Sequence, residues 1–222
     1  MRGKMIKLVS ILIICSQWAY SQKNIKLFNG KDLNGWYAFN EESGKKENAI
    51  EIFNVENKMI RMYGTKAGYL MSNMEFSDFK LTMEYRWNLD TTFARKNNSK
   101  NSGVMYLVPK ESSDMLWPKG IQFQIKENAT GDFVLLQDVT LVIKGEKSVP
   151  GKSVVCKRFV DAEKPFGEWN TVEIISENGK ITQMLNGKLV NEGTDASVQK
   201  GRILLQYEGF PIDFRKLEIK KI

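Results

Sequence analysis

The sequence of 222 residues contains no histidine, and this absence removes several kinds of active site. Ser-His-Asp and Cys-His nucleophile arrangements both need an imidazole base, so they are excluded. Zinc sites that use histidine ligands are excluded as well. Any proton transfer must therefore use Asp, Glu, Lys, Tyr or a thiol.

Cysteine is also scarce, with Cys15 near the N-terminus and Cys156 as the only other one. If the N-terminal segment is removed, the remaining chain has one thiol and can form no internal disulfide. Its stability must then come from a hydrophobic core, which about 200 residues in one domain are enough to bury. Cys156 follows two valines, which is typical of a small buried side chain.

Residues 1–21 have the pattern of a secretory signal peptide. Three basic residues come first, followed by the apolar run from Leu8 to Ile14 and then by small residues before a cleavage site at Gln22. The run is too short to span a bilayer, and no later segment is apolar enough to do so. We therefore expect export across the inner membrane into the periplasm, with residues 22–222 forming one domain.

A lipoprotein is the alternative to a cleaved signal peptide, because Cys15 follows the apolar run. Lipoprotein processing requires a small residue before the cysteine, and Ile14 is not small. Cleavage at Gln22 would remove three basic residues and no acidic residue, so the net charge would fall from +7 to +4. The remaining basic residues are mixed with acidic ones, unlike the clustered stripe that binds nucleic acid. No nucleic-acid partner is therefore expected.

Long amphipathic helix patterns are absent, and short strand patterns separated by turns take their place. In Phe79–Trp87, for example, apolar residues alternate with polar ones. Further strands are expected at residues 104–108, 121–126, 133–136, 139–143, 171–176, 180–185, 188–190, 203–206 and 212–219, with residues 144–168 as a loose connection. Asn178-Gly179 and Asn186-Gly187 are strong signals for two-residue hairpin turns. The pattern predicts an all-β jelly-roll sandwich of two antiparallel sheets.

The stretch IQFQIKENATGD, residues 121–132, raises the question of what the polar faces of these strands do. Gln122, Gln124 and Lys126 fall on one face of the expected strand, and Glu127 follows. A polar face is usually solvated surface, but two amides and charged groups in one row can also line a sugar-binding cleft. Asn101, at the end of a polar loop, either caps that loop or binds sugar hydroxyls.

Charged residues at a spacing of two occur in two other strands. Glu84 and Arg86 share a polar face, which fits either a surface ion pair or a carboxylate beside a guanidinium in a cleft. Arg215 stands in the same relation to Asp213.

Gln206 and Glu208 also share a face, just before the Gly-Phe-Pro corner at residues 209–211. Glu208 either accepts hydrogen bonds from backbone N–H groups at this turn or has a catalytic role. Trp117 lies in another polar loop and is the tryptophan best placed to stack on a sugar ring.

Seven short motifs occur in order along nearly the whole chain after the predicted signal peptide: LFNGKDLNGW, LTMEYRW, NSGV, GDFVLL, GEWN, MLNG and LLQYEGFPIDFRKLEIK. With these motifs in register, the sequence resembles the 3-keto-disaccharide hydrolase family. The resemblance implies a concanavalin A-like jelly roll of the lectin and glucanase type. It also implies an exported enzyme that acts on sugars whose C3 hydroxyl has been oxidised to a ketone. The chain departs from many relatives at Gln122, where they carry glutamate, and at Gln183, where they carry histidine.

A ketone at C3 makes the hydrogen at C2 acidic, so a base can remove it and the enolate can expel the group at C1 before water adds back. This elimination differs from the oxocarbenium route of ordinary glycosidases. It needs a carboxylate base and a positive group near the enolate oxygen. We predict Glu208 as the base and Arg86 as its electrostatic partner, with Glu84 and Arg215 as the alternatives.

The substrate is predicted to contact a set of polar and aromatic side chains: Asn101, Gln122, Gln124, Glu127, Gln206, Arg215 and Trp117. The polar rows are expected to converge, so that Glu84, Arg86, Gln124, Glu127, Gln206, Glu208 and Arg215 point into one concave cleft. No ligand spacing demands a metal, so no cofactor is predicted, although carboxylates and amides could hold a divalent cation.

Two other functions stay open on the sequence. A carbohydrate-binding protein without catalysis would use Gln122 and Gln183 as amides that bind sugar but move no proton. A conventional glycoside hydrolase would need two carboxylates about 5–5.5 Å or about 6.5–9.5 Å apart, and no E-x-D-x-x-E row supports it.

Overall fold

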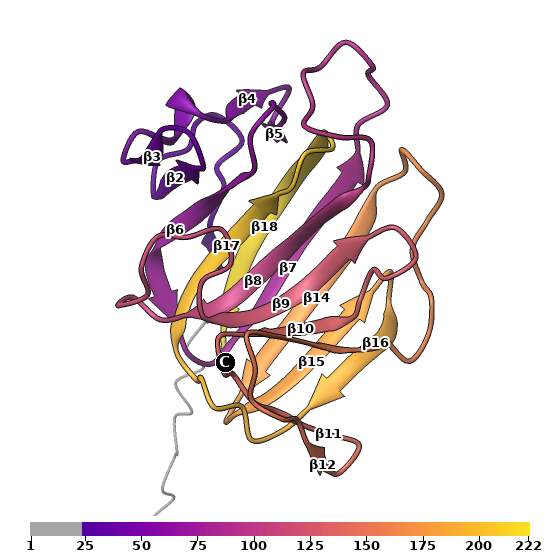
Figure 1. Cartoon of the computed structure of the whole chain (residues 1–222). Coiled ribbons are helices and arrows are strands. Elements are labelled where there is room, and N and C mark those ends of the chain that lie inside the picture. The colour runs from indigo at the N-terminus through magenta and orange to yellow at the C-terminus, as the bar shows by residue number, and fades with distance from the viewer. Residues whose placement is uncertain (1–23) are drawn as a thin grey trace, which may run out of the picture.

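The computed structural model describes residues 24–222, so the predicted signal peptide, its cleavage site and Cys15 lie outside the described residues. The described chain consists of strands, turns and one short 3-10 helix, η1 (Ala49–Glu51). Two large antiparallel sheets pack face to face as a sandwich (Figure 1). The predicted all-β fold of two antiparallel sheets is therefore confirmed.

One sheet, which we call the β7 sheet after its central strand, has the order β16-β15-β14-β7-β18-β5-β4, with β1 paired to β18. Its strands are β1 (Ile25–Lys26), β4 (Asn54–Glu56), β5 (Met59–Met62), β7 (Phe79–Trp87), β14 (Asn170–Glu177), β15 (Lys180–Leu185), β16 (Lys188–Gly193) and β18 (Ile212–Lys221). β7 and β14 alternate regularly between buried and partly exposed residues, as a period of two requires.

The other sheet, the β8 sheet, has the order β13-β10-β9-β8-β17-β6-β2-β3. Its strands are β2 (Trp36–Asn40), β3 (Gly44–Lys46), β6 (Gly68–Phe76), β8 (Asn101–Val108), β9 (Gly120–Lys126), β10 (Phe133–Leu136), β13 (Ser153–Cys156) and β17 (Gly201–Tyr207). A small separate ribbon pairs β11 (Val142–Ile143) with β12 (Glu146–Lys147). β8, β9 and β17 are buried on both faces along nearly their whole length, so something must cover the outward face of this sheet.

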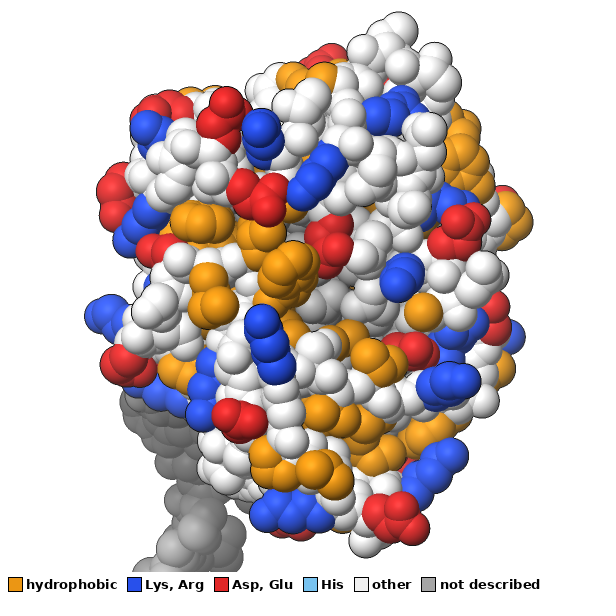
Figure 2. All heavy atoms as spheres, in the orientation of Figure 1, with side chains coloured by type: hydrophobic (Ala, Val, Ile, Leu, Met, Phe, Trp, Pro, Cys, Tyr) orange, Lys and Arg blue, Asp and Glu red, His pale blue; other side chains and the backbone are white. Residues whose placement is uncertain are grey.

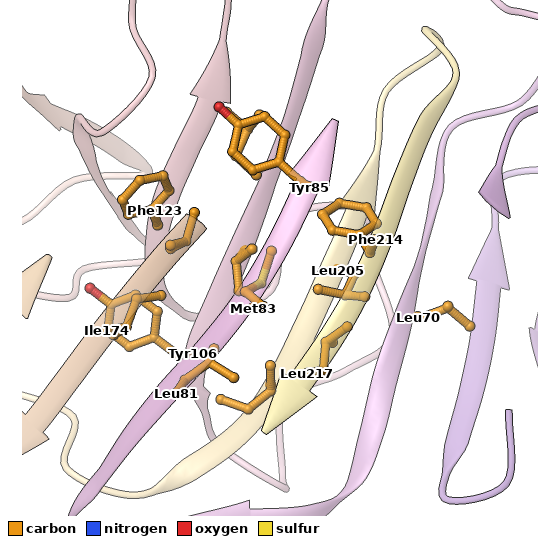
Figure 3. Packing of buried hydrophobic residues seen from close by; sticks show 14 of the residues in the cluster. Leu70, Leu81, Met83, Tyr85, Tyr106, Phe123, Ile174, Leu205, Phe214 and Leu217 are labelled. Carbon is orange, nitrogen blue, oxygen red and sulfur yellow. The ribbon is translucent and has the colours of Figure 1, made fainter. Parts of the chain in front are cut away.

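The core fills the space between the two sheets. Figure 3 shows Leu81, Met83 and Tyr85 of β7 in the same buried cluster as Tyr106 of β8 and Phe123 of β9, and all five side chains are fully buried. In β7 and β9 these side chains alternate with polar neighbours, so the inward faces of both strands are fixed by their apolar residues, whereas Tyr106 lies in an apolar run. The polar neighbours must therefore point away from the core, on one sheet or the other.

Both predicted hairpin turns are present. Asn178 and Gly179 have φ values of 49° and 76°, and Asn186 and Gly187 have values of 51° and 79°. Positive φ at both central residues is the geometry of the turn that joins two twisted strands with two residues, and Asn-Gly adopts it readily. The turns fix β14, β15 and β16 as neighbours in the β7 sheet.

Two expectations about the middle of the chain are wrong. The strand expected at residues 139–143 is limited to Val142–Ile143, because the chain before it leaves the sheet through positive φ angles at Gln137 and Asp138. The connection at residues 144–168 is not entirely loose, since it contains β12 and the edge strand β13. β13 spans four residues and pairs with β10, too short a segment for its alternation to be recognised. No helix in residues 24–222 is long and apolar enough to cross a membrane.

Candidate functional site

The outward face of the β8 sheet carries a row of amide side chains where β17, β8 and β9 lie side by side. Gln206 comes from β17, Asn101 from the start of β8, and Gln122 and Gln124 from β9. Each of them alternates with an inward apolar or small residue, so all four project from the same face. Gln122 and Gln206 are 2% and 1% exposed, so these amides are a buried network rather than solvated surface.

The amides form a hydrogen-bonded chain with a fixed direction. The Nε2 group of Gln122 donates to Oε1 of Gln206 at 3.1 Å and to Oε1 of Gln124 at 2.8 Å. Nε2 of Gln124 donates to Oδ1 of Asn101 at 2.8 Å, and Nδ2 of Asn101 donates to the carboxylate of Glu208. Because Gln122 uses both of its N–H groups, its orientation is set, and the donors run toward Glu208.

Gly103 provides the space that this chain of hydrogen-bonded amides needs. It lies on β8 directly opposite Gln124, between the strands that carry the other amides. A Cβ atom at this position would be 2.2 Å from Nε2 of Gln122 and 2.6 Å from its side-chain carbonyl carbon. The missing side chain therefore lets Gln122 lie across β8 and reach Gln206.

Glu208 follows the last residue of β17 and is the carboxylate at the end of the amide chain. Besides Asn101, it accepts a hydrogen bond of 3.2 Å from the indole Nε1 of Trp117. Burial raises the pKa of Glu208 above its usual value, and the Trp117 hydrogen bond and the positive charges of Lys126 and Lys96 offset only part of that effect. A carboxylate with a raised pKa holds a proton more readily, as a general base must.

Residues 109–119, which we call the strap, cross the outward face of the β8 sheet and hold Trp117 over Glu208. Oδ1 of Asp114 accepts hydrogen bonds from the hydroxyls of Tyr37 at 2.6 Å and Tyr69 at 2.7 Å. The carbonyl of Trp117 accepts a bond of 3.1 Å from Nε2 of Gln137, after β10. The strap is thus bonded to β2 and β6 toward one edge of the β8 sheet and to Gln137, after β10, toward the other edge. It therefore covers the outward residues beneath it, which explains why they are buried.

A cavity of about 610 Å³ opens between the strap, β8, β9, β10 and β13. Its polar lining residues are Asn101, Gln122, Gln124, Lys126, Asp132, Gln137, Lys152, Ser153 and Glu208. Figure 2, in the orientation of Figure 1, shows a hollow on this face over β8 and β9, bordered by apolar side chains and by charged ones of both signs. A cavity of this size accommodates a disaccharide or another two-ring molecule.

Five of the predicted site residues are brought together in this cavity: Asn101, Trp117, Gln122, Gln124 and Glu208. Gln206 supports them from beneath, through its bond to Gln122. Lys126 was part of the polar row in residues 121–132 but was not selected as a site residue, although its period-two position marks it as clearly as those of the two glutamines. Asp114 gave no sequence signal, because its importance depends on two tyrosines that are far away in the chain.

The prediction that seven polar residues converge in one cleft is wrong. Glu84, Arg86 and Arg215 lie on the outward face of the β7 sheet, across the core from the cavity. Nε of Arg215 donates to Glu84 at 2.6 Å, and Nε of Arg86 donates to Asp213 at 3.0 Å, so they form cross-strand ion pairs. The alternation of a strand identifies which side chains point outward, but not from which of the two sheets.

Glu127 is also separate from the amide row. It forms an ion pair of 2.7 Å with Lys100 and lines a different, smaller cavity beside Glu163 and Phe166. β9 ends at Lys126, so the alternation of side chains along this strand does not determine where the Glu127 side chain points.

Gln183, the second position at which the chain departs from many relatives, lies inside the sandwich. It is fully buried in β15, and its Nε2 donates to the hydroxyl of Tyr106 at 2.9 Å. This departure therefore does not alter the cavity, whereas Gln122 is part of the cavity lining.

The described residues contain no group of three or more Cys, His, Asp or Glu side chains that could hold a metal ion. The second carboxylate of the cavity, Asp132, accepts a bond of 2.9 Å from the backbone N–H of Arg158 and lies 3.6 Å from its guanidinium. Asp132 is therefore engaged by Arg158, whereas the hydrogen-bond partners of Glu208 are neutral, so Glu208 is the carboxylate of the cavity better placed for proton transfer.

Comparisons with known proteins agree with this architecture. Residues 23–220 match the family described as the 3-keto-alpha-glucoside-1,2-lyase-like domain. A curated relative, the 3-keto-disaccharide hydrolase of Bacteroides thetaiotaomicron, is 24% identical over 185 residues. The aligned part covers 76% of this chain and 57% of the relative, so the chain spans somewhat more than half of that protein's length.

Solved structures with the same fold include a candidate glycosyl hydrolase from Parabacteroides distasonis ATCC 8503, with a TM-score of 0.63 at 18% identity over 90% of this chain and 94% of that one. The Bacillus licheniformis beta-glucanase has a TM-score of 0.57 at 11% identity, over 89% and 97% of the two chains. These likenesses confirm the concanavalin A-like jelly roll. Because the family match extends over nearly all of the described residues, the chain belongs to the family of 3-keto-alpha-glucoside-1,2-lyase-like domains.

Proposed function

We propose that the protein is a carbohydrate-active enzyme that cleaves glycosides whose C3 carbon is a ketone. The observation that carries this proposal is Glu208, a partly buried carboxylate with a raised pKa at the wall of a sugar-sized cavity. The groups that donate hydrogen bonds to it, the amide of Asn101 and the indole of Trp117, are neutral and do not compete for the proton. The family description, which refers to a 1,2-lyase of 3-keto-glucosides, supports an elimination between C1 and C2.

In the proposed mechanism, Glu208 removes the proton from C2, and the electron pair moves into the C3 carbonyl to form an enolate. The enolate then expels the group at C1, and a C1–C2 double bond forms. Water then adds its hydroxyl to C1, Glu208 returns its proton to C2, and the remaining proton of the water passes to the expelled alkoxide, so the overall reaction is a hydrolysis. Lys126, in the same cavity, replaces Arg86 as the positive group near the enolate oxygen, because Arg86 lies on the other sheet.

The test uses purified protein, a 3-keto disaccharide and the same disaccharide with its C3 hydroxyl restored. Release of the keto sugar from the first substrate and none from the second would support the proposal, because only the ketone makes C2–H removable. Turnover of both substrates at similar rates would refute it in favour of a conventional glycosidase.

A carbohydrate-binding protein without catalysis is the second candidate, favoured by one feature of the cavity. Gln122 stands where many relatives carry glutamate, and both of its N–H groups are engaged in the amide chain. A site made of amides would bind the keto sugar and its parent with similar affinity. Calorimetric binding of both sugars, with turnover of neither, would establish this candidate.

Export is part of the proposal and rests on the signal-peptide pattern of residues 1–21. Expression of the full chain in a bacterial host, followed by mass spectrometry of the periplasmic fraction, would reveal a chain that starts at Gln22. A diacylated chain that starts at Cys15 would instead establish the lipoprotein alternative.

A further inference from the structure

Glu208 lies at the point where the backbone leaves the β8 sheet. β17 ends at Tyr207, whose register partner on β8 is Ser102, so Glu208 is one residue beyond the hydrogen-bonded ladder. The amide of Asn101 and the indole of Trp117 hold its carboxylate. Strand pairing does not hold the backbone from which this carboxylate projects, so the position of that backbone depends on contacts outside the sheet.

The loop between β7 and β8, residues 88–100, packs against the corner between β17 and β18 that contains Glu208 (Figure 1). Three consecutive loop residues contact three consecutive corner residues in antiparallel order: Arg95 with Phe210, Lys96 with Gly209, and Asn97 with Glu208. The loop is also attached to the segment between β5 and β6, where the backbone N–H of Gly64 donates to the carbonyl of Ala94 at 2.9 Å. The corner therefore rests on a loop that is itself bonded to the body of the fold.

Asn97 makes the contact that reaches the backbone of Glu208. Its side-chain Nδ2 donates to the carbonyl of Glu208 at 3.1 Å, and its backbone N–H donates to the carbonyl of Gly209 at 3.3 Å. Its Oδ1 accepts a hydrogen bond of 2.8 Å from the backbone N–H of Ser99. Because the acceptor side of this amide is used within the loop, its donor side is directed at Glu208.

The close approach of the loop depends on Gly209. A Cβ atom at this position would lie 2.6 Å from Cβ of Lys96 and 2.9 Å from Nδ2 of Asn97. The φ angle of Gly209 is 124°, a conformation that residues with side chains rarely adopt. Glycine is therefore needed here for the shape of the corner and also for its contact with Asn97.

Lys96 couples the same loop to Glu208 by charge. Its Nζ forms an ion pair of 2.9 Å with Glu41, which keeps the ammonium group on this side of the loop. Burial raises the pKa of Glu208, and the positive charge of Lys96 is among the effects that offset part of that rise. The loop thus acts on Glu208 through two independent contacts, one with its backbone and one with its charge.

From these contacts we infer that Asn97 is a positioning residue for the base, because its side-chain amide fixes the backbone of Glu208 at the wall of the cavity. This inference rests on the proposed function and adds a residue that does not line the cavity. Since Asn97 bonds to the backbone of Glu208 and not to the sugar-binding amides, it affects proton removal rather than sugar binding. A displacement of about 1 Å at a reacting group is enough to cost about 10²-fold in rate.

The experiment measures kcat and KM on a 3-keto disaccharide as a function of pH, for the full chain and three variants. Asn97→Ala removes the amide, whereas Asn97→Asp keeps an acceptor for Ser99 but places no donor against the carbonyl of Glu208. Asn98→Ala is the matched control, because Asn98 is also exposed and takes no part in these contacts. On the pH-independent plateau, both Asn97 variants should lower kcat about tenfold to hundredfold and leave KM within about twofold.

Proton NMR of the Trp117 indole N–H reports the position of Glu208 without any turnover, because this N–H donates to the carboxylate. The resonance is identified by its absence in Trp117→Phe. Asn97→Ala should shift the resonance, and Asn98→Ala should leave it unchanged. A general loss of folding would instead change the resonances of all the tryptophans.

The two measurements separate the failure of this inference from the failure of the proposed function. Full plateau activity in either Asn97 variant, or an equal loss in Asn98→Ala, would overturn the positioning role and leave the proposed function intact. A shifted Trp117 resonance in Asn97→Ala, in a protein whose wild type cleaves no keto sugar, would support the positioning role and refute the proposed reaction. An unshifted resonance together with an inactive wild type would overturn both.

Discussion

The two sheets present outward polar rows that arise from the same alternating pattern but differ in chemistry. On the β7 sheet, charges pair across strands: Glu84 accepts bonds from Arg215 at 2.6 Å and from Lys216 at 2.8 Å. Trp169 contacts two guanidinium groups, with the carbon of Arg215 at 3.8 Å and that of Arg86 at 4.7 Å from the ring centroid. On the β8 sheet, neutral amides bond to one another and end at a single carboxylate, Glu208.

The difference is expressed in the pKa values of the two glutamates. Burial raises the pKa of Glu84, but hydrogen bonds from Lys216 and Arg215 outweigh it and hold that pKa below the usual value. Burial raises the pKa of Glu208, and its hydrogen-bond partners are neutral, so the net shift is upward. A carboxylate neutralised by two cations is a poor base, whereas one kept among amides retains its affinity for a proton.

The largest expected effect is on the base itself. Glu208→Gln keeps the shape of the side chain but removes its ability to accept a proton, so it should lower kcat on a 3-keto-glycoside by on the order of 10²–10⁴. Glu84→Gln is the matched control on the β7 sheet and should leave kcat within about twofold. Steady-state kinetics of both variants test this prediction. A large loss of kcat in Glu84→Gln with none in Glu208→Gln would show that the reaction takes place on the β7 sheet and not on the β8 sheet.

A smaller effect is expected at Gly103, which gives Gln122 its room. Gly103→Ala forces the amide of Gln122 to move, because an added Cβ atom would lie 2.2 Å from its Nε2. The amide chain is then broken beside Glu208, and kcat/KM should fall about tenfold, with an overpacking cost to stability of about 1–3 kcal/mol.

A double-mutant cycle with Gln122→Ala tests the cause of that loss. If Gly103 acts through Gln122, the alanine at residue 103 should cost little activity once the glutamine is gone. Additive losses in the cycle would show that Gly103 matters for another reason.

The sequence was sufficient to predict the fold and part of the site, for an identifiable physical reason. The period of two in Phe79–Trp87 and the two Asn-Gly turns depend on neighbouring residues only, so they can be recognised without tertiary information. The same is true of the polar row of β9, which contains Gln122 and Gln124. The family motifs added the jelly-roll class and the expected chemistry.

What the sequence could not predict was the assignment of rows to sheets. Glu84 and Glu208 each lie in a polar row that alternates with apolar residues. Only the pairing of β7 with β18 and of β8 with β17 shows that the two rows belong to different sheets. The role of Asp114 also depends on contacts with Tyr37 and Tyr69, which precede it by 77 and 45 residues. Such partners are selected by the topology, which local patterns do not encode.

The indole of Trp117 provides a finer test of how Glu208 is tuned. Its hydrogen bond lowers the pKa of Glu208, so Trp117→Phe, which keeps an aromatic ring but removes the N–H, should raise that pKa further. The base must be ionised to act, so the acid limb of the kcat/KM profile should move to higher pH. Trp169→Phe, on the outward face of the β7 sheet, is the control and should leave the profile unchanged. An unshifted limb in Trp117→Phe would mean that the indole does not contact the working base.

The smallest effect is on stability, and it should have opposite signs on the two faces. The folded pKa of Glu84 lies below the unfolded value of about 4.3, so its contribution to the free energy of unfolding is present above that pH and is lost as the pH falls through the folded pKa. The folded pKa of Glu208 lies above the unfolded value, so its contribution is fully present below about pH 4.3 and is lost as the pH rises through the folded pKa.

Urea unfolding of the wild type and both Gln variants at pH 7 and pH 3 measures these two contributions. Between pH 7 and pH 3, the wild type should lose stability relative to Glu84→Gln and gain stability relative to Glu208→Gln. The change for Glu84 should be about 0.2–1 kcal/mol, because its partners are partly exposed and the pair is screened by solvent. Differences that move in the same direction for both variants would contradict the contrast between the two faces, because they would place the two carboxylates in equivalent electrostatic surroundings.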